Sequence, residues 1–480
     1  MKCPLLTALV ALGAAGQATA QNSRPNVLVL LVDDMQMGAI HAFGGQAATP
    51  NIDALASNGV GFTRCHTNGA IGGALSQPSR AMIMTGRHLF ELQADGAVIP
   101  EAHVTMPKHF HDNGYATFAT GKWHSDRASF NRTFAAAENI FFGGMHQYNL
   151  GGQTAPRLHH FDPSGRYDTP FIGNEFSSKM FADAAIGFID TARHASAPWF
   201  VYVAFTSPHD PRNVRPDYAP GYQADGIRLP PNFVPQHPFD NGDMTVRDEA
   251  LIPPPHTPDT VRQELAYYYQ MVSEVDVQIG RIVDKLHRTG TLDNTIIVFA
   301  SDNGLAMGQH GLMGKQNVYE HSMGVPMIVC GPGVKRGVRS EACCYLSDVF
   351  PTLCDMVGID APNSVTAISL ASALRGEKAG RETLLLAYSS IQRAVIHNGW
   401  KYVIYNVEGV ITEQLFDLAA DPWEAHSHAA DPRHAARKAE YRELLRQQMK
   451  LHGDFCNLDN PRWWSKGGKI TGKDIQVLFL

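Results

Sequence analysis

The stretch NVLVLLVDD, residues 26–34, is a short apolar run that stops abruptly at two adjacent aspartates. Three later runs have the same form, each rich in β-branched and aromatic residues and each followed at once by a polar cluster: residues 115–120 before GKWH, residues 199–205 before TSPH, and residues 295–300 before SDNG. Their length and composition are typical of strands buried on both faces. We therefore expect four core strands, each ending in polar residues.

Helical patterns separate these runs, at residues 51–58, 105–113, 178–194 and 261–289. Strands that alternate with helices indicate an α/β fold with a large, mostly parallel sheet sandwiched by helices. In such a sheet, ligands bind outside the carboxyl ends of the strands. The four polar clusters are therefore predicted to meet at one edge of the sheet and to form one site.

The pattern changes after about residue 375. Residues 391–404 and 407–418 are predicted to form antiparallel strands, and a charged helix follows near residues 433–452. We interpret this part as a smaller C-terminal α+β subdomain, an antiparallel sheet plus a helix. The predicted division is a signal peptide at residues 1–20, a catalytic domain at 21–375 and the subdomain at 376–480. Within the catalytic domain, residues 207–258 are rich in Pro, Asp and Asn and predict a long loop, of a kind that is usually functional or mobile.

The N-terminal residues are typical of a signal peptide, with Lys2, an apolar stretch at residues 5–15 and an A-x-A cleavage site ending at Ala20. No run approaches the roughly 20 apolar residues that span a bilayer. We expect a periplasmic or secreted protein with no membrane span. The 40 Lys and Arg against 46 Asp and Glu give a net charge of -6, which argues against general nucleic-acid binding. The six cysteines beyond Cys3 show no zinc pattern and are expected to be mostly buried thiols, with at most one disulfide.

The segment LSQPSRAMIMTGR, residues 75–87, carries the most specific chemical signal. Pro78 suits the first turn of a helix, so Ser76 is predicted just before the amino end of that helix. Backbone N–H groups and the helix dipole favour negative charge at that point, and Arg80 lies one turn further in. A serine that only caps a Pro-initiated helix would show the same spacing. The spacing alone leaves both interpretations open.

Two strand-end clusters carry hard oxygen ligands: Asp33 and Asp34 after the first run, Asp302 and Asn303 after the last. Such ligands suit Ca²⁺ or Mg²⁺ rather than zinc. Either pair alone could be a turn or a helix cap, but both together at one edge of a sheet predict a metal site.

Positive and titratable side chains accompany these ligands. Lys122 and Lys315 each follow a glycine in a strand-end or loop segment and, with Arg80, could neutralise a tetrahedral anion. His124 and His209 are candidate acid/base groups because imidazole titrates near neutrality.

Residues 76–80, with the later TGR, resemble the sulfatase signature, in which Cys or Ser is followed by x-P-S-R. The resemblance continues in the order of that family over nearly the whole chain. Its further motifs are DD (33–34), TPNID (49–53), GKWH (121–124), SPH (207–209), SDNG (301–304), GK (314–315) and YE (319–320). The chain is therefore similar to formylglycine-dependent, serine-type sulfatases of the alkaline-phosphatase superfamily.

The resemblance implies that Ser76 is oxidised to Cα-formylglycine. It also implies that one Ca²⁺ is held by residue 76 together with four others: Asp33, Asp34, Asp302 and Asn303. Lys122 and Lys315 would bind sulfate, and Arg80 would hold the nucleophile. One hydroxyl of the hydrated aldehyde would attack sulfur, His209 or else Lys315 would protonate the leaving alcohol, and His124 would deprotonate the second hydroxyl to release sulfate. A serine-type signature further implies a radical-SAM maturase as partner.

The expected reaction is hydrolysis of a sulfated carbohydrate, with glycosaminoglycan or mucin-type glycans as the leading substrates. A phosphonate monoester or phosphodiester hydrolase of the same superfamily is the alternative, and a non-catalytic glycan-binding protein is a further one. Asn303 stands where two-zinc phosphatases place His, which disfavours that class. Side chains that could contact a sugar, although each also suits a plain surface position, are Arg212, Arg215, His159, His160, Trp400 and His426.

Overall fold

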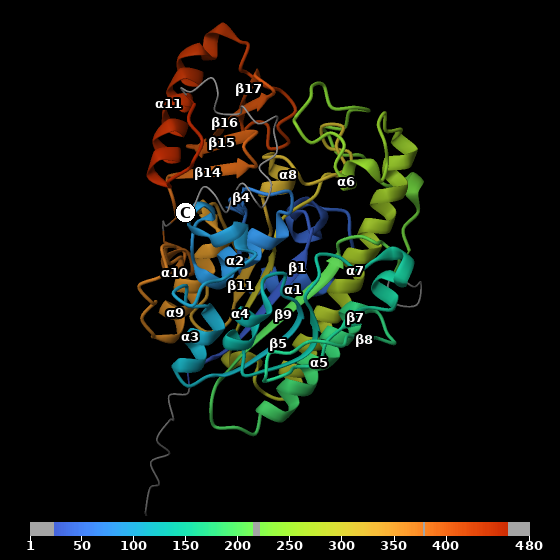
Figure 1. Ribbon diagram of the computed structural model, residues 1–480, viewed down its shortest axis with the longest axis vertical. Coiled ribbons are helices and arrows are strands. Elements are labelled where there is room, and N and C mark those ends of the chain that lie inside the picture. The colour runs from blue at the N-terminus through green and yellow to red at the C-terminus, as the bar shows by residue number, and fades with distance from the viewer. Residues whose placement is uncertain (1–23, 215–220, 378–379, 459–480) are drawn as a thin grey trace, which may run out of the picture.

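The computed structural model describes residues 24–214, 221–377 and 380–458, so the predicted signal peptide lies outside the described residues. Its main feature is an eight-stranded sheet with helices on both faces (Figure 1). In spatial order the strands are β12 (Val338–Ser340), β2 (Gly59–Phe62), β11 (Met327–Cys330), β10 (Thr295–Ser301), β1 (Asn26–Asp33), β9 (Trp199–Pro208), β5 (Ala116–Lys122) and β6 (Ala136–Phe141). β11 runs antiparallel to both of its neighbours, and all other pairs are parallel. The predicted α/β fold with a mostly parallel sheet is confirmed.

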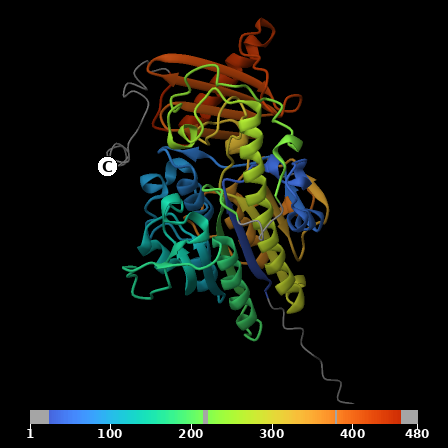
Figure 2. The same cartoon turned by 90° about the vertical axis from the view of Figure 1, so that its right-hand side faces the viewer.

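Strand β1 lies in the middle of the sheet, and its apolar run explains the two-sided core. All eight of its residues are buried, because side chains that alternate along the strand pack against helices on both faces. Val29 belongs to one core and Leu30 to the other. One face is covered by α1 (Pro50–Ser57), α5 (Ser177–Ala192) and α7 (Pro258–Arg288), and the other by α2 (Ser76–Thr85), α3 (Met106–Asp112), α4 (Arg127–Thr133) and α9 (Val349–Val357) (Figures 1 and 2).

A second sheet, with five strands, is formed mainly by the C-terminal part of the chain and lies at the top of Figure 1. Its order is β17 (Val410–Asp417), β16 (Trp400–Val407), β15 (Gln392–His397), β14 (Thr383–Tyr388) and β4 (Gly69–Ala70). Helix α11 (Ala435–Leu451) packs on it through Tyr441, Leu445 and Met449. The antiparallel sheet with one helix confirms the predicted subdomain architecture. The domain boundary at residue 375 stays a prediction.

Two details of this sheet differ from the sequence prediction. Residues 391–404 form two strands rather than one, because Asn398 and Gly399, both at positive φ, make a tight hairpin turn between β15 and β16. The edge strand β4 comes from residues shortly before Ser76 and pairs in parallel with β14. The C-terminal sheet is therefore hydrogen-bonded directly to the segment that leads into α2.

Short elements complete the described chain: β3 (Cys65–His66) with β13 (Cys344–Tyr345), β7 (Arg157–Leu158) with β8 (Phe171–Ile172), and the helices α6 (Arg247–Ala250), α8 (Glu320–Met323) and α10 (Ala371–Leu374). The predicted long loop at 207–258 contains, in its described part, only α6 and a 3-10 turn as helices. The six cysteines beyond Cys3 are free thiols and all but Cys343 are buried. Within the described residues no helix is long and apolar enough to cross a bilayer.

Candidate active site

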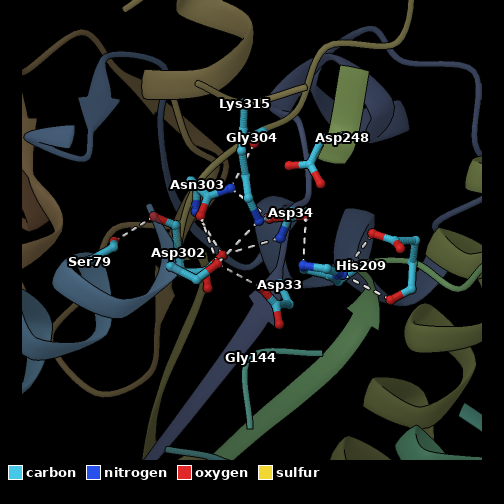
Figure 3. Close-up of polar contacts among 12 residues, drawn as sticks. Asp33, Asp34, Ser79, Gly144, His209, Asp248, Asp302, Asn303, Gly304 and Lys315 are labelled. Atoms are coloured by element: carbon cyan, nitrogen blue, oxygen red, sulfur yellow. Dashed lines mark hydrogen bonds and ion pairs between the residues drawn. The ribbon is translucent and has the colours of Figure 1, made fainter. Parts of the chain in front are cut away.

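The polar clusters that follow β1, β5, β9 and β10 lie together at the carboxyl edge of the main sheet. Figure 3 shows residues of the clusters after β1, β9 and β10. These four strands are neighbours and run parallel, so their carboxyl ends are at the same edge. Lys315 enters this cluster from a loop, and the start of α2 brings Ser76. The structure therefore places every side chain predicted for the site in one region.

Ser76 is at the centre of this cluster and is 2% exposed. Its Oγ lies 3.1 Å from Asp33 Oδ1 and 3.0 Å from Asn303 Oδ1, and Lys315 Nζ donates to it over 3.5 Å. Helix α2 begins at Ser76 itself, with Pro78 in its first turn as predicted, so Ser76 is the first residue of the helix and does not lie just before it. Ser76 still occupies the first turn, where free N–H groups and the dipole favour an anion.

The backbone is in the left-handed region at two positions of the site, at Asp34 itself and at the glycine before Lys122. Asp34 has a φ of 67°, and Gly121, directly before Lys122, has a φ of 96°. The pairing of β5 with β6 shifts register between Thr120 and Gly121, as in a β-bulge. A Cβ on Gly121 would lie 1.9 Å from the carbonyl oxygen of Ala204. Only glycine allows this close approach to β9, and it sets the position from which Lys122 enters the site.

Three buried cations face three buried carboxylates. Arg80 Nη2 lies 2.9 Å from Asp302 Oδ2, Lys122 Nζ 2.6 Å from Asp33 Oδ2, and Lys315 Nζ 2.6 Å from Asp34 Oδ1. None of these six side chains is more than 6% exposed. Buried charges persist only when they are paired, so each group depends on its partner.

The carboxylates remain crowded despite this pairing. Burial, together with the charges of Asp33 and Asp34, raises the pKa of Asp302 to about 6 although Arg80 and Lys122 oppose it. Burial also favours the neutral form of Asp33, but Lys122 and Arg80 outweigh it and lower the pKa of Asp33 well below its ordinary value. A raised pKa beside like charges indicates that the cluster can accept further positive charge.

The donor set fits a hard divalent cation. Carboxylate, amide and hydroxyl oxygens from the residues of the predicted metal site converge there, namely Asp33, Asp34, Ser76, Asp302 and Asn303. Oxygen donors of this kind suit Ca²⁺. His209 is also close enough to be a ligand, because its ring and the Asp33 and Asp34 carboxylates offer atoms within 4.8 Å of one another. We favour the oxygen set, because the raised pKa of His209 favours its protonated form, in which Nε2, 3.6 Å from Asp34 Oδ2, carries a hydrogen and cannot bind a metal.

The two histidines of the site have opposite protonation preferences. Burial alone would lower the pKa of His209, but the carboxylates of Asp34 and Asp210 outweigh it, and the pKa is raised. Burial and then the charge of Lys122 lower the pKa of His124 well below its ordinary value. His124 has a φ of 72°, and its buried Nδ1 has no hydrogen-bond partner among the described residues. One histidine therefore favours the charged form and the other the neutral form.

Sequence reasoning missed a chain of polar contacts that connects His209 to the loop of Lys315. His209 Nδ1 lies 3.0 Å from Asp210 Oδ1, and Arg247 of α6 donates to both oxygens of Asp210, over 2.6 and 2.8 Å. Arg247 also pairs with Asp248, which accepts from Gln316 Nε2 over 2.9 Å. Asp210 directly follows the SPH motif and could have been singled out. The position of Arg247, within the long loop, had no signal in the sequence.

Most of the side chains proposed for sugar contact have other partners. Arg212 donates to Glu264 over 2.9 Å, so its charge is neutralised within the fold. His160 stacks on Phe171 and pairs with Glu138. The remaining ones are placed as follows: His159 is half-buried near Phe142, Trp400 packs on His428 and His434, His426 is exposed, and Arg215 lies outside the described residues.

Comparison with known proteins gives consistent matches over most of the chain. The family profile described as Sulfatase matches residues 25–359, and the one described as N-sulphoglucosamine sulphohydrolase, C-terminal, matches residues 308–451. A choline-sulfatase of Rhizobium meliloti is 29% identical over 442 residues, which cover 85% of this chain and 83% of the relative. An N-acetylglucosamine-6-O-sulfatase of Bacteroides thetaiotaomicron is 25% identical, with 94% and 91% covered. A structure solved with D-glucosamine-2-N,6-O-disulfate as its substrate superimposes with a TM-score of 0.71 at 23% identity, covering 90% of this chain and 99% of that one.

Proposed function

We propose that this chain, which belongs to the sulfatase family and is a sulfuric ester hydrolase, removes sulfate from a sulfated glycan at the site around Ser76. One observation carries the proposal. A serine at the first turn of a buried helix lies within hydrogen-bonding distance of Asp33, Asn303 and Lys315, where three carboxylates and three cations converge. A serine that only capped a helix would not need this buried charge around it.

We propose that Ser76 is oxidised to Cα-formylglycine and that Ca²⁺ is held by oxygens of Asp33, Asp34, Asp302, Asn303 and residue 76. When both are in place, the hydrated aldehyde supplies the nucleophilic hydroxyl and the ion supplies positive charge beside it. The donor set and the raised pKa of Asp302 support the ion. The resemblance of residues 76–80 to the sulfatase signature supports the modification.

The cations of the site orient the sulfate group. Lys122, Lys315 and Arg80 are held by carboxylates, so their charges are fixed in position before the substrate arrives. Burial alone would lower the pKa of Lys315, but Asp34 and Asp248 outweigh it and raise the pKa, so this lysine keeps its proton. It is therefore suited to hold an anion and less suited to donate a proton. Preorganised charges of this kind stabilise the charge that develops in the transition state.

Proton transfer is assigned to the two histidines. His209, whose pKa is raised, donates from Nε2 to the oxygen of the leaving alcohol. Its Nδ1 is held by Asp210, so the ring keeps one orientation. His124, whose pKa is lowered, takes a proton from the hydroxyl that expels sulfate. An acid and a base of opposite pKa shift are the arrangement that two-step hydrolysis requires.

We propose a glycosaminoglycan or mucin-type glycan as substrate, an exported protein that reaches it outside the cytoplasm, and a radical-SAM enzyme that modifies Ser76. The name of the N-acetylglucosamine-6-O-sulfatase relative supports a sugar substrate. The N-terminal pattern at residues 1–20 supports export. The choline-sulfatase relative makes choline sulfate a necessary competitor in any substrate test.

The test uses protein co-expressed with a serine-type maturase and loaded with Ca²⁺, and peptide mass spectrometry establishes oxidation of Ser76. We expect sulfate release from defined sulfated mono- and oligosaccharides to exceed release from choline sulfate. Ser76→Ala abolishes turnover, whereas the matched control Ser196→Ala, an exposed serine of a loop, keeps it.

Three outcomes would contradict parts of the proposal. Near-full activity of Ser76→Ala, or of a preparation without oxidised Ser76, would refute the role of the modified residue. Faster turnover of an aryl phosphonate than of the matching aryl sulfate would favour the phosphonate hydrolase. Calcium and glycan binding without any sulfate release would favour a non-catalytic protein. Removal of Ca²⁺ with a chelator should abolish activity, and its readdition should restore it.

A further inference from the structure

A second group of metal-ligating side chains lies in the C-terminal subdomain, in the segment between β17 and α11. It consists of His428, Asp431 and His434, whose ligand atoms all lie within 4.8 Å of one another. All three residues are half-buried. They belong to different elements from the residues around Ser76, and the reaction proposed above does not use them.

The local backbone explains why these three side chains come together. The N–H of Asp431 donates to the carbonyl of His428, and that of His434 to the carbonyl of Asp431, each over 3.0 Å. Two successive turns of three residues each therefore separate the ligands. The second turn is the 3-10 helix Pro432–His434, and Asp431 between the two turns is extended, with φ -81° and ψ 118°, so its carboxylate lies where the two turns meet. The Asp431 carboxylate also accepts from the N–H of Arg433 and so caps the turn Pro432–His434.

The surroundings of the two imidazoles also suit a ligand role. The His428 and His434 rings have centroids 4.8 Å apart, and Trp400 of β16 packs against them at 5.6 and 5.3 Å. Within the described part of the chain, neither imidazole has a side-chain hydrogen bond, so their ring nitrogens are free to bind an ion.

We propose that His428, Asp431 and His434 bind one Zn²⁺ ion, with the fourth position open to solvent. Two imidazoles and one carboxylate form a ligand set that Zn²⁺ commonly takes when it keeps a water as fourth ligand. Tetrahedral bonds of about 2.1 Å place ligand atoms about 3.4 Å apart. The ligand atoms now lie within 4.8 Å of one another. Each distance between them must therefore shorten by at most about 1.4 Å, which rotation about χ1 and χ2 permits.

One cation competes with the metal for the carboxylate. Arg433 Nη2 lies 2.6 Å from Asp431 Oδ2, and its Nε contacts both carboxylate oxygens. The Arg433 side chain is 85% exposed, so it can turn into solvent when an ion binds. Exposed ion pairs of this kind contribute little free energy. A second guanidinium, that of Arg437, lies 4.0 Å from the Trp400 ring centroid and adds positive charge nearby.

The experiment is a calorimetric titration of ZnCl₂ into the full chain, without a histidine tag and with Ca²⁺ saturating the first site. The wild type should bind one Zn²⁺ more per chain than the double variant His428→Ala/His434→Ala. The matched control is His426→Ala, an 87% exposed histidine two residues away, which should leave the titration unchanged. Asp431→Asn keeps a good helix-capping residue but loses the carboxylate, and should weaken Zn²⁺ binding at least about tenfold.

Arg433→Gln provides a test of opposite sign, because removal of the competing guanidinium should tighten Zn²⁺ binding several-fold. Equal stoichiometry in the wild type and the double variant would overturn the proposal, as would a loss in His426→Ala as large as that in the double variant. Thermal unfolding in metal-free buffer shows whether each variant folds. If the double variant does not fold, Asp431→Asn decides, and unchanged affinity in that variant refutes the site. The readout is metal binding, so it is independent of sulfatase activity.

Discussion

Lys401 of β16 is a fully buried cation that joins the two parts of the chain. Its Nζ lies 2.9 Å from Glu320 of α8 and 2.8 Å from Glu424, which follows β17. Lys401 and Glu424 are at most 1% exposed, whereas the Glu320 side chain is 25% exposed and also pairs with His66. Lys401→Met would leave Glu424 as a buried carboxylate without its cation. Removal of one partner of a buried pair costs about 3–5 kcal/mol of the free energy of unfolding.

The pH dependence of this loss follows from Glu424. Burial and the charge of Glu320 raise the pKa of Glu424 to about 7, even though Lys401 opposes the shift. Without Lys401 the pKa rises further, so the folded variant holds a proton above pH 7 that the folded wild type has lost. The variant is therefore least destabilised below pH 7. Above pH 7, the loss in free energy of unfolding relative to wild type grows by about 1.4 kcal/mol per pH unit, until the pH reaches the pKa of Glu424 in the variant.

Urea unfolding at pH 6, 7 and 8.5, followed by circular dichroism, measures both effects. The matched control is Lys438→Met. Lys438 pairs with Glu413 over 3.2 Å but is 31% exposed, and its loss should cost no more than about 1 kcal/mol. The reasoning is refuted if Lys401→Met costs less than about 1 kcal/mol at pH 8.5, or if its cost decreases as the pH rises.

Three further predictions each concern a single residue. Gly121→Ala should lower the free energy of unfolding by more than about 2 kcal/mol in urea, because the new Cβ would lie 1.9 Å from the Ala204 carbonyl oxygen. The control is Gly187→Ala in α5, where a Cβ meets no atom within 4 Å and should stabilise the fold by about 0.5–1 kcal/mol. Asp210→Asn should reduce kcat at least about tenfold for alkyl sulfates, because their leaving oxygen needs a proton from His209, which Asp210 orients. The reduction should be much smaller for nitrophenyl sulfate, whose leaving group needs no proton. An equal reduction for both substrates would contradict this orienting role. Burial raises the pKa of Glu274 to about 8, so the stability it contributes at low pH is lost as the pH rises from about 5 to 8, by up to about 1.4 kcal/mol per pH unit. Glu274→Gln should remove that slope from unfolding curves, and an unchanged slope would show that Glu274 titrates normally.

The fold and the centre of the site could be predicted because both depend on short-range patterns. A buried strand that ends in polar residues is readable from a few positions, and parallel pairing then requires the ends of β1, β5, β9 and β10 to meet. Asn-Gly between apolar runs is a strong turn signal, so the hairpin at Asn398 and Gly399 could also have been predicted, in place of the single strand expected over residues 391–404.

The contacts that were missed depend on where long loops lead. Arg247 reaches Asp210 across 37 positions of chain, within the segment rich in Pro, Asp and Asn. No periodicity specifies such a course, because it is fixed by side-chain pairs that form only after the sheet exists. The triad of His428, Asp431 and His434 was missed for a different reason. Its regular spacing of three is visible in the sequence, but it gains meaning only once a 3-10 turn is known to be there.

The pairing of β4 with β14 imposes an order on events during biosynthesis. β4 ends six residues before Ser76, whereas β14 begins at Thr383, 307 residues after it (383 minus 76). At about 5–20 residues per second, a ribosome needs roughly 15 to 60 seconds to make the intervening chain. Until then the strand that leads into α2 has no partner, and afterwards Ser76 is 2% exposed. If Ser76 is oxidised as proposed, the modifying enzyme has its best access while the chain is still being made or before it folds. We therefore expect the yield of modified protein to depend on translation speed and on how quickly the C-terminal sheet forms.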